Sequence, residues 1–87
     1  PNTALATTAE RAFSRALSGS CHTPLAAHAV HRHGEVWLRG LLASRDGKEV
    51  MRGDRSAPVT GVDAADALGL ALADEFLARG AGRLCGL

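Results

Sequence analysis

The hydrophobic positions nearest the N-terminus recur with the spacing of an amphipathic helix. Apolar residues lie three and four positions apart, at Ala9, Ala12, Phe13, Ala16 and Leu17. This spacing places them on one face of a helix, and polar residues, Glu10 among them, take the other face. The pattern predicts a helix that ends at about Leu17, with Gly19 as its stop.

Two starting points are open for this helix. Thr7 and Glu10 have the T-x-x-E spacing of a capping box, in which each side chain accepts a hydrogen bond from the other residue's backbone N–H. Asn2 or Thr3 at the N-cap would instead begin the helix a turn earlier.

Three strands are predicted next, over residues 25–32, 35–43 and 49–54. The first shows a period of two, and the third runs through Val50 and Met51. His33-Gly34 and Asp46-Gly47 separate them as turn candidates, because glycine accepts the positive φ that tight hairpins need. The second strand is the most apolar, so we expect it in the middle of an antiparallel meander.

Glycines interrupt two of these strands. Gly40 lies inside the second strand and Gly53 inside the third. A glycine within a strand indicates a bulge or a close backbone approach. We expect one of these at Gly40 and a bulge at Gly53.

A loop over residues 56–62, broken by Pro58 and Gly61, separates the sheet from a second helix. This helix is expected from about Asp63, whose side chain can cap it, to Gly80. Its inward stripe consists of Leu68, Ala71, Leu72 and Phe76, widened by Ala67 and Leu77. One more helical turn is expected around Leu84.

These elements define an α+β fold, a three-stranded antiparallel sheet with two or three helices packed on one face. With 87 residues, the chain is expected to form a single domain over 1–87.

Composition excludes several kinds of partner. The ten Lys and Arg and nine Asp and Glu are interspersed, with a formal net charge of +1. Nucleic-acid-binding domains show a clustered basic face or stacking aromatics, and only 3% of these residues are aromatic. No apolar run approaches the roughly 20 residues that cross a bilayer. Two cysteines are too few for a disulfide framework, so we expect a cytoplasmic domain. From the charge pattern and the short apolar runs, we expect that it binds neither nucleic acid nor membranes.

Cys21 is the candidate for covalent chemistry. It stands between the end of the first helix and Pro24, where the first strand begins. The negative end of the helix dipole disfavours a thiolate there, which is a poor setting for a nucleophile that turns over. The position suits a thiol that reacts once and keeps its adduct as an uncharged thioether. A small buried core residue is the alternative interpretation.

The remaining cysteine and the histidines carry no comparable signal. Cys85 lies near the C-terminus and is interpreted as a packing or incidental thiol. The histidines, with Cys21 nearby, look like metal ligands at first: His22, His28, His31 and His33. On a strand, however, His31 and His33 share a face and His28 points to the other, so we expect solvated histidines and no metal site.

Two charged groups are interpreted as solvated surface. Arg52, Asp54 and Arg55 form a charged end to the third strand that blunts pairing between sheets, or alternatively an interface with a missing part of a larger enzyme. The acidic residues of the second helix form a wet face: Asp63, Asp66, Asp74 and Glu75.

Motifs along nearly the whole chain resemble one family, porphobilinogen deaminase, also called hydroxymethylbilane synthase. They are Glu10-Arg11, Gly19-Ser20-Cys21, Pro24-Leu25, Ala27, Trp37-Leu38-Arg39, Asp46-Gly47, Arg52-Gly53-Asp54-Arg55 and the helix from Asp63 to Gly80. The family usually has Gly-Gly-Cys where this chain has Gly19-Ser20-Cys21. The match covers only the family's C-terminal third.

The resemblance implies a role for Cys21. In the family, this cysteine carries a dipyrromethane cofactor through a thioether. The cofactor primes the addition of four porphobilinogen units, with loss of ammonia at each, before hydroxymethylbilane is released. Two further domains on the N-terminal side supply the catalytic aspartate and an arginine-rich cleft, and no stretch of this chain matches them. We therefore expect a cofactor-anchoring domain that has no catalytic residue of its own and is inactive alone.

Two other classes of function are alternatives to a cofactor-anchoring domain. A non-catalytic α+β module would use its sheet face to bind a protein partner, because helices cover only the other face. A cysteine hydrolase is disfavoured because the sequence positions no base beside Cys21.

Overall fold

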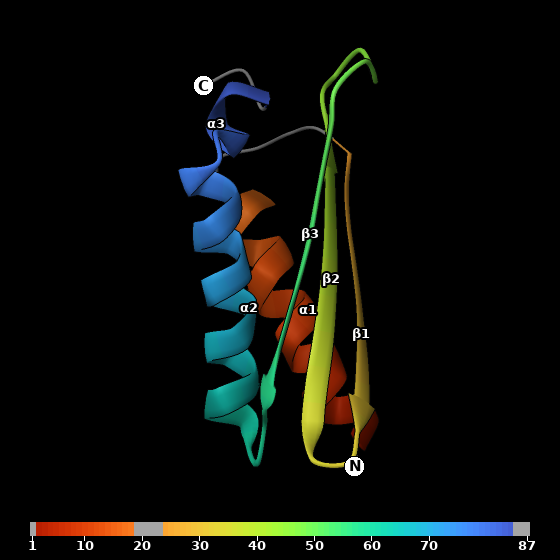
Figure 1. Ribbon diagram of the computed structural model, residues 1–87, viewed down its shortest axis with the longest axis vertical. Helices are drawn as coiled ribbons and strands as arrows, with labels where there is room; N and C mark the ends of the chain where they lie inside the picture. Colours follow the sequence, from red (N-terminus) through yellow and green to blue (C-terminus); the bar gives the residue numbers. More distant parts are fainter. Residues whose placement is uncertain (1, 19–23, 85–87) are drawn as a thin grey trace.

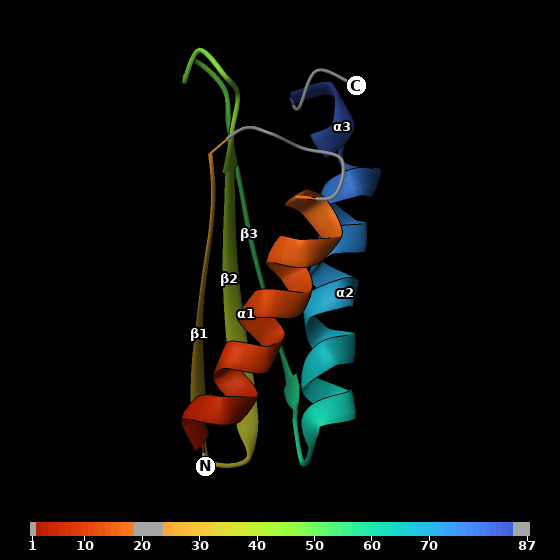
Figure 2. The same cartoon turned by 180° about the vertical axis from the view of Figure 1, so that it is seen from behind.

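The computed structural model describes residues 2–18 and 24–84. Its elements are α1 (Asn2–Ser18), β1 (Leu25–Arg32), β2 (Glu35–Ala43), β3 (Val50–Pro58), α2 (Val62–Ala78) and the short α3 (Ala81–Leu84). The three strands form one antiparallel sheet in the order β1-β2-β3, and α1 and α2 lie on the same face of it (Figures 1 and 2). The expected α+β fold, with the apolar second strand in the middle, is confirmed.

The hairpin between β1 and β2 has the expected tight turn. His33 and Gly34 both have positive φ, at 55° and 78°. Two positive φ values in succession define the turn whose twist matches that of the flanking strands. The second hairpin is a longer loop, in which Gly47 has a φ of 74° and its N–H donates to the Ser44 carbonyl at 3.0 Å.

The two strand glycines are paired rather than bulged, so the bulge expected at Gly53 is wrong. Pairing runs without interruption along β2 and β3, and Gly40 lies opposite Gly53. Each glycine makes room for an aromatic ring from a helix. A Cβ on Gly40 would lie 2.8 Å from Phe13 Cε2, and one on Gly53 would lie 2.8 Å from Phe76 Cε1.

The two phenylalanine rings form the centre of the core. Phe13 of α1 and Phe76 of α2 meet edge to face, with centroids 5.1 Å apart and ring planes at 83°. Aromatic pairs in this arrangement stabilise the fold by more than the burial of their surface area alone would give. Around them lie the large side chains that are fully buried: Leu17, Val36, Leu38, Leu42, Val59 and Leu72.

The helix α2 presents its small residues to α1. A Cβ on Gly69 would overlap the Ala9 carbonyl oxygen and lie 2.6 Å from Ala12 Cβ. The buried face of α2 therefore includes Ala65, Gly69 and Ala73, whereas Ala67 and Leu77, expected to widen the stripe, are exposed. A hydrophobicity pattern favours large residues, but close helix packing places small ones at the contact.

Two boundaries differ from the expected ones. β3 continues to Pro58, so residues 56–58 belong to the sheet rather than to the loop. Proline fits there because β3 is an edge strand, and every second residue of such a strand points its backbone polar groups away from the sheet. Pro58 is one of these residues, as is Arg52, so the missing N–H of Pro58 costs no hydrogen bond to β2. Also, α2 begins at Val62 with Gly61 as its N-cap, and Asp63 lies in the first turn without capping it.

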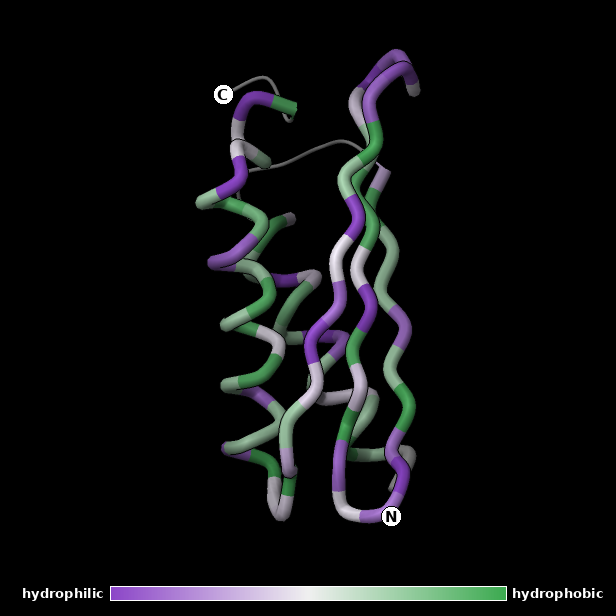
Figure 3. Tube along the Cα trace, in the orientation of Figure 1, coloured by the Kyte–Doolittle hydropathy of each residue, from purple (hydrophilic) through white to green (hydrophobic). Residues whose placement is uncertain are grey.

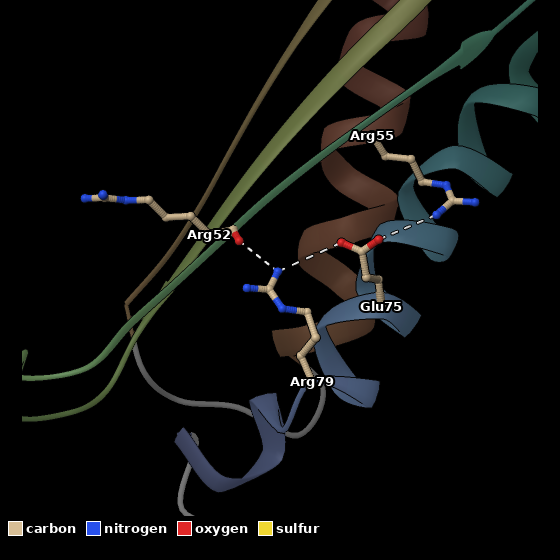
Figure 4. A network of polar contacts seen from close by, with 4 residues as sticks. All are labelled: Arg52, Arg55, Glu75 and Arg79. Carbon is tan, nitrogen blue, oxygen red and sulfur yellow. Dashed lines mark hydrogen bonds and ion pairs between the residues drawn. The ribbon is translucent and has the colours of Figure 1, made fainter.

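Side chains from the helices reach both edges of the sheet. On the β1 edge, Glu10 Oε2 accepts a hydrogen bond of 2.6 Å from the Ala29 N–H. On the β3 edge, Arg79 Nη1 donates to the Arg52 carbonyl oxygen at 2.8 Å (Figure 4). Both bonds satisfy backbone groups that an edge strand leaves unpaired within the sheet.

Candidate functional site

The stretch that contains Cys21 connects α1 to β1, and residues 19–23 lie outside the described residues. The structure describes the two ends of this connection. α1 ends at Ser18 and β1 begins at Leu25, and both ends lie towards the end of the molecule that carries α3 (Figures 1 and 2). The chain therefore passes from the helix layer to the sheet layer at this end of the domain.

Both ends of the connection are held by the fold. On the helix side, Leu17 is buried in the core. On the strand side, the Pro24 carbonyl accepts a hydrogen bond of 3.0 Å from the Ala43 N–H, which extends the β1–β2 ladder by one residue. The described residues on either side of the connection therefore belong to well-packed elements of the fold.

Glu10 makes a contact that the sequence did not predict. α1 begins at Asn2, so the earlier of the two expected starts is correct and Glu10 does not belong to a capping box. Its carboxylate bonds the Ala29 N–H of β1, 19 positions away in the sequence. Helical spacing gave no signal for this contact, because it depends on how α1 lies against the sheet.

The β2–β3 hairpin tip lies at the same end of the molecule and is strongly hydrophilic (Figures 1 and 3). Asp46 Oδ1 accepts hydrogen bonds from the Ser44 hydroxyl at 2.6 Å and from the Lys48 N–H at 3.0 Å. Both bonds favour the carboxylate, the Ser44 hydroxyl most, and lower the pKa of Asp46 from its ordinary value of 3.8. A shallow hollow of about 370 Å³ separates this tip from Arg83 and Leu84.

The sheet face opposite the helices carries a polar cluster around Trp37. The indole Nε1 donates to Asp54 Oδ2 at 2.7 Å, and the Arg39 guanidinium lies 4.4 Å from the indole centroid. Arg39 and Asp54 are cross-strand partners, and Trp37 remains 36% exposed. The apolar composition of residues 35–43 predicted a central strand but gave no signal for these contacts across the sheet.

The described histidines do not lie on the faces expected, and His31 is not fully solvated, because its Nδ1 is buried without a hydrogen-bond partner among the described residues. His28 lies on the open face opposite Arg39, His31 on the helix-covered face opposite Val36, and His33 in the turn. His31 and His33 therefore do not share a strand face. Among the described residues, no group of three or more His, Cys, Asp or Glu is placed to hold a metal ion. His22 and Cys85 lie outside the described residues.

The charged residues of β3 and α2 are only partly solvated surface. Arg52 and Asp54 project on the open face, but Arg55 lies on the other face, with its Nη1 3.7 Å from Glu75 Oε1. Glu75 Oε2 is also 3.9 Å from Arg79 Nη1 (Figure 4). Glu75 thus links α2 to β3, whereas the three aspartates of α2, Asp63, Asp66 and Asp74, are exposed as expected.

Fold and site together define a small open-faced α+β domain that holds one cysteine-bearing connection between its helix layer and its sheet. Residues 4–78 match the family model described as "Porphobilinogen deaminase, C-terminal domain". The chain belongs to this family.

Curated relatives agree with the family model. The chain is 53% identical over 81 residues to porphobilinogen deaminase of Burkholderia orbicola (strain MC0-3), and 52% identical over 81 residues to that of Burkholderia ambifaria. It is 48% identical over 80 residues to that of Paraburkholderia phytofirmans. These alignments cover 92–93% of this chain but only 23–25% of each relative, so the chain spans about a quarter of their length. No helix among the described residues is long and apolar enough to cross a membrane.

Proposed function

We propose that this chain is the cofactor-anchoring domain of a porphobilinogen deaminase, and that Cys21 carries the dipyrromethane cofactor through a thioether. The proposal rests on membership of the family over residues 4–78, a range that includes Cys21. The placement of Cys21 between α1 and β1 supports it, because both flanking elements are anchored in the fold.

The residue type fits the attached group. A thiol forms a thioether when its sulfur displaces the amine of an aminomethylpyrrole. The carbon–nitrogen bond breaks, a carbon–sulfur bond forms, and the thiol proton leaves with the ammonia. The dipyrromethane, once attached, supplies the end on which four porphobilinogen units are condensed into hydroxymethylbilane. This chain's contribution is to hold the sulfur in place through α1 and the start of β1.

The remainder of the reaction is assigned to the part of the enzyme that this chain does not span. We place the catalytic aspartate and the arginine-rich cleft for the acidic substrate in two N-terminal domains, which are the expected partners of this domain. The ten Lys and Arg of this chain are interspersed with nine acidic residues, so it lacks a polyanion-binding cleft of its own. We place the enzyme in the cytoplasm.

The intact mass of the full-length enzyme tests the anchor. We expect the wild type to be heavier than its polypeptide by two pyrrole units, and Cys21→Ala to have the bare polypeptide mass. Cys85→Ala is the matched control, since it removes the other cysteine and should keep the added mass. Bare mass in all three chains after incubation with porphobilinogen would overturn the assignment.

One observation favours a second function, a non-catalytic module that binds a protein partner through its sheet. The open face carries Trp37, which is 36% exposed, and aromatic residues are enriched at protein interfaces. This becomes the leading function if Cys21 never acquires the cofactor.

A further inference from the structure

The open face of the sheet has the composition of an interface. An antiparallel strand with one face in water normally places polar residues on that face. β2 instead places Trp37 and Leu41 there, with Arg39 between them, and Trp37 lies opposite Val30 of β1. Tryptophan and arginine are enriched at protein interfaces and carry a large share of their binding energy. This face is therefore suited to contact with another protein surface.

The Trp37 side chain is held in place within the domain itself. Its Nε1 donates to Asp54 Oδ2 at 2.7 Å, and the Arg39 guanidinium lies 4.4 Å from the ring centroid. A side chain that is already fixed loses little conformational entropy when a partner binds. Trp37 is therefore a preorganised anchor on a face that leaves it 36% exposed.

Two arginines on this face lack a carboxylate partner among the described residues. Both ion pairs in this part of the chain are made by Glu75, on the helix-covered side of the sheet, and neither involves Arg39 or Arg52. Figure 4 shows the Arg52 side chain pointing away from Glu75. Asp54 already accepts the indole N–H of Trp37.

The space between these two arginines can receive a carboxylate. Arg39 and Arg52 both border a hollow of about 580 Å³ on the open face, together with Leu41. Arginine binds carboxylates in a bidentate geometry, and such charge-assisted hydrogen bonds are stronger than neutral ones. The face is thus complementary in charge to a surface that carries Asp or Glu side chains.

The area of the open face indicates how the partner is connected to this domain. β2 and β3 have nine residues each, so the face is about 30 Å long, and three strands about 4.8 Å apart make it about 14 Å wide. Covering it would bury about 400 Å² on each side, or about 800 Å² in total. Complexes between separate proteins typically bury about 1,600 Å², whereas interfaces between domains of one chain bury about 600–1,500 Å². The area therefore favours a neighbouring domain of the same polypeptide over a separate protein or a second copy.

The relatives of this chain contain such a neighbour. The chain spans about a quarter of their length, and the family model that it matches is that of a C-terminal domain. We propose that the open face of the sheet docks on an acidic surface in the part of the enzyme that precedes this domain. Trp37 is the apolar anchor of this contact, and Arg39 and Arg52 bind carboxylates of the preceding part. This inference rests on the function proposed above, which makes the chain one domain of a larger enzyme.

A zero-length cross-link in the full-length enzyme tests the contact. Arg52→Lys keeps the positive charge and introduces a primary amine, which a carbodiimide couples to a carboxylate in direct contact, taking up the water that is lost. Peptide mass spectrometry then identifies the carboxylate. We expect a cross-link to an Asp or Glu residue outside this domain. Arg55→Lys is the matched control and should cross-link to Glu75, because these two side chains are 3.7 Å apart.

Removal of the anchor should release the docked face. In the Arg52→Lys background, we expect Trp37→Ala to lower the yield of the cross-link about threefold or more, because aromatic anchors carry much of the energy of an interface. The cross-link between Arg55→Lys and Glu75 should keep its yield when Trp37→Ala is added, since Arg55 and Trp37 lie on opposite faces of the sheet. An unchanged control yield shows that the domain is still folded.

Three results would overturn the inference. The first is a reaction of the Arg55→Lys control without any cross-link from Arg52→Lys to a residue outside the domain, which would show a solvated face. The second is a cross-link to another enzyme molecule, which would assign the face to association between copies. The third is a yield that Trp37→Ala does not change.

The intact mass of the same samples reports separately on the proposed function. Cofactor mass without the cross-link would overturn only the docking of the open face. The cross-link without cofactor mass would overturn only the thioether at Cys21.

Discussion

At the scale of single residues, Gly69 sets how closely the two long helices approach. It lies inside α2, where glycine is normally unfavourable by about 1 kcal/mol relative to alanine. If helix propensity decided the outcome, Gly69→Ala would stabilise the domain. The structure predicts the opposite sign, because the new Cβ would overlap the Ala9 carbonyl oxygen and crowd Ala12 Cβ. We expect a loss of about 1–3 kcal/mol in the free energy of unfolding, measured with urea.

Ala67→Gly is the matched control for that change. Ala67 is exposed on the same helix, so replacing it changes helix propensity without changing the contact with α1. It should lose about 1 kcal/mol. An increase in stability for Gly69→Ala would show that the helices are not in close contact at this point.

Asp46 makes the hairpin tip sensitive to acid. Its pKa is lowered in the folded state, chiefly by the Ser44 hydroxyl, so the folded protein favours the carboxylate more than the unfolded chain does. This contribution is fully present above the ordinary pKa of 3.8 and is lost as the pH falls through the lowered value. We expect Asp46→Asn to be less stable than wild type near neutral pH, and the difference to shrink as the pH falls below 3.8 in urea titrations.

Ser44→Ala removes the same hydrogen bond from its other side. It should reduce the acid sensitivity of the wild type, and the double variant should lose less stability than the sum of the two single losses. A stability difference between wild type and Asp46→Asn that does not change with pH would contradict this explanation.

At the scale of elements, Arg79 and Arg55 both hold α2 to β3 but by different contacts (Figure 4). Arg55 makes only a half-exposed ion pair of 3.7 Å with Glu75. Arg79 adds a hydrogen bond to the Arg52 carbonyl and lies 5.5 Å from the Phe76 ring centroid. We expect Arg79→Ala to lose about 1–2 kcal/mol and Arg55→Ala about 0.5 kcal/mol or less.

High salt distinguishes the contribution of Arg55 to stability from that of Arg79. Screening weakens an exposed ion pair more than a hydrogen bond or a ring contact. In about 1 M NaCl the effect of Arg55→Ala should disappear and most of the effect of Arg79→Ala should remain, by urea denaturation. Equal loss of both effects in salt would contradict the assigned contacts.

The sequence predicted the elements better than their ends. Periodicity identified α1, β1 and α2, because one buried face imposes it on each of them. Apolar content and the flanking turn residues identified β2 and β3. The sequence did not predict that β3 extends to Pro58, since pairing with β2 overrides the local preference for a loop. It also misread Gly53, because the ring that occupies the space beside it comes from Phe76, 23 positions away.

For the candidate site, sequence reasoning could name Cys21, but it could not predict the polar contacts between elements. A cysteine after a helix stop is visible in the sequence, and its proposed role came from resemblance to a family. The bond between Glu10 and Ala29, and the contacts of Trp37 with Asp54 and Arg39, depend on the docking of elements on one another. No periodicity within one element contains that information.

At the scale of the whole molecule, the chain corresponds to about a quarter of its relatives. We expect the isolated 87-residue chain to show no conversion of porphobilinogen, because the proposed catalytic aspartate and substrate cleft belong to the remaining three quarters. A colorimetric assay of porphobilinogen consumption, with full-length enzyme as the positive control, measures this. Turnover by the isolated chain would contradict the proposal that the catalytic residues lie in the part of the enzyme that this chain does not span.

The meander order of the sheet influences the order in which contacts form during folding. Each strand pairs with its neighbour along the chain, and such hairpins form within about 1–10 μs. α1 and α2 flank the three strands in the sequence, so their contact must close a much longer loop and is expected to form later. α1, which precedes the connection that bears Cys21, is therefore fully docked only when this last contact has closed. Under the function proposed above, slow helix docking would therefore delay the moment at which Cys21 can accept the cofactor.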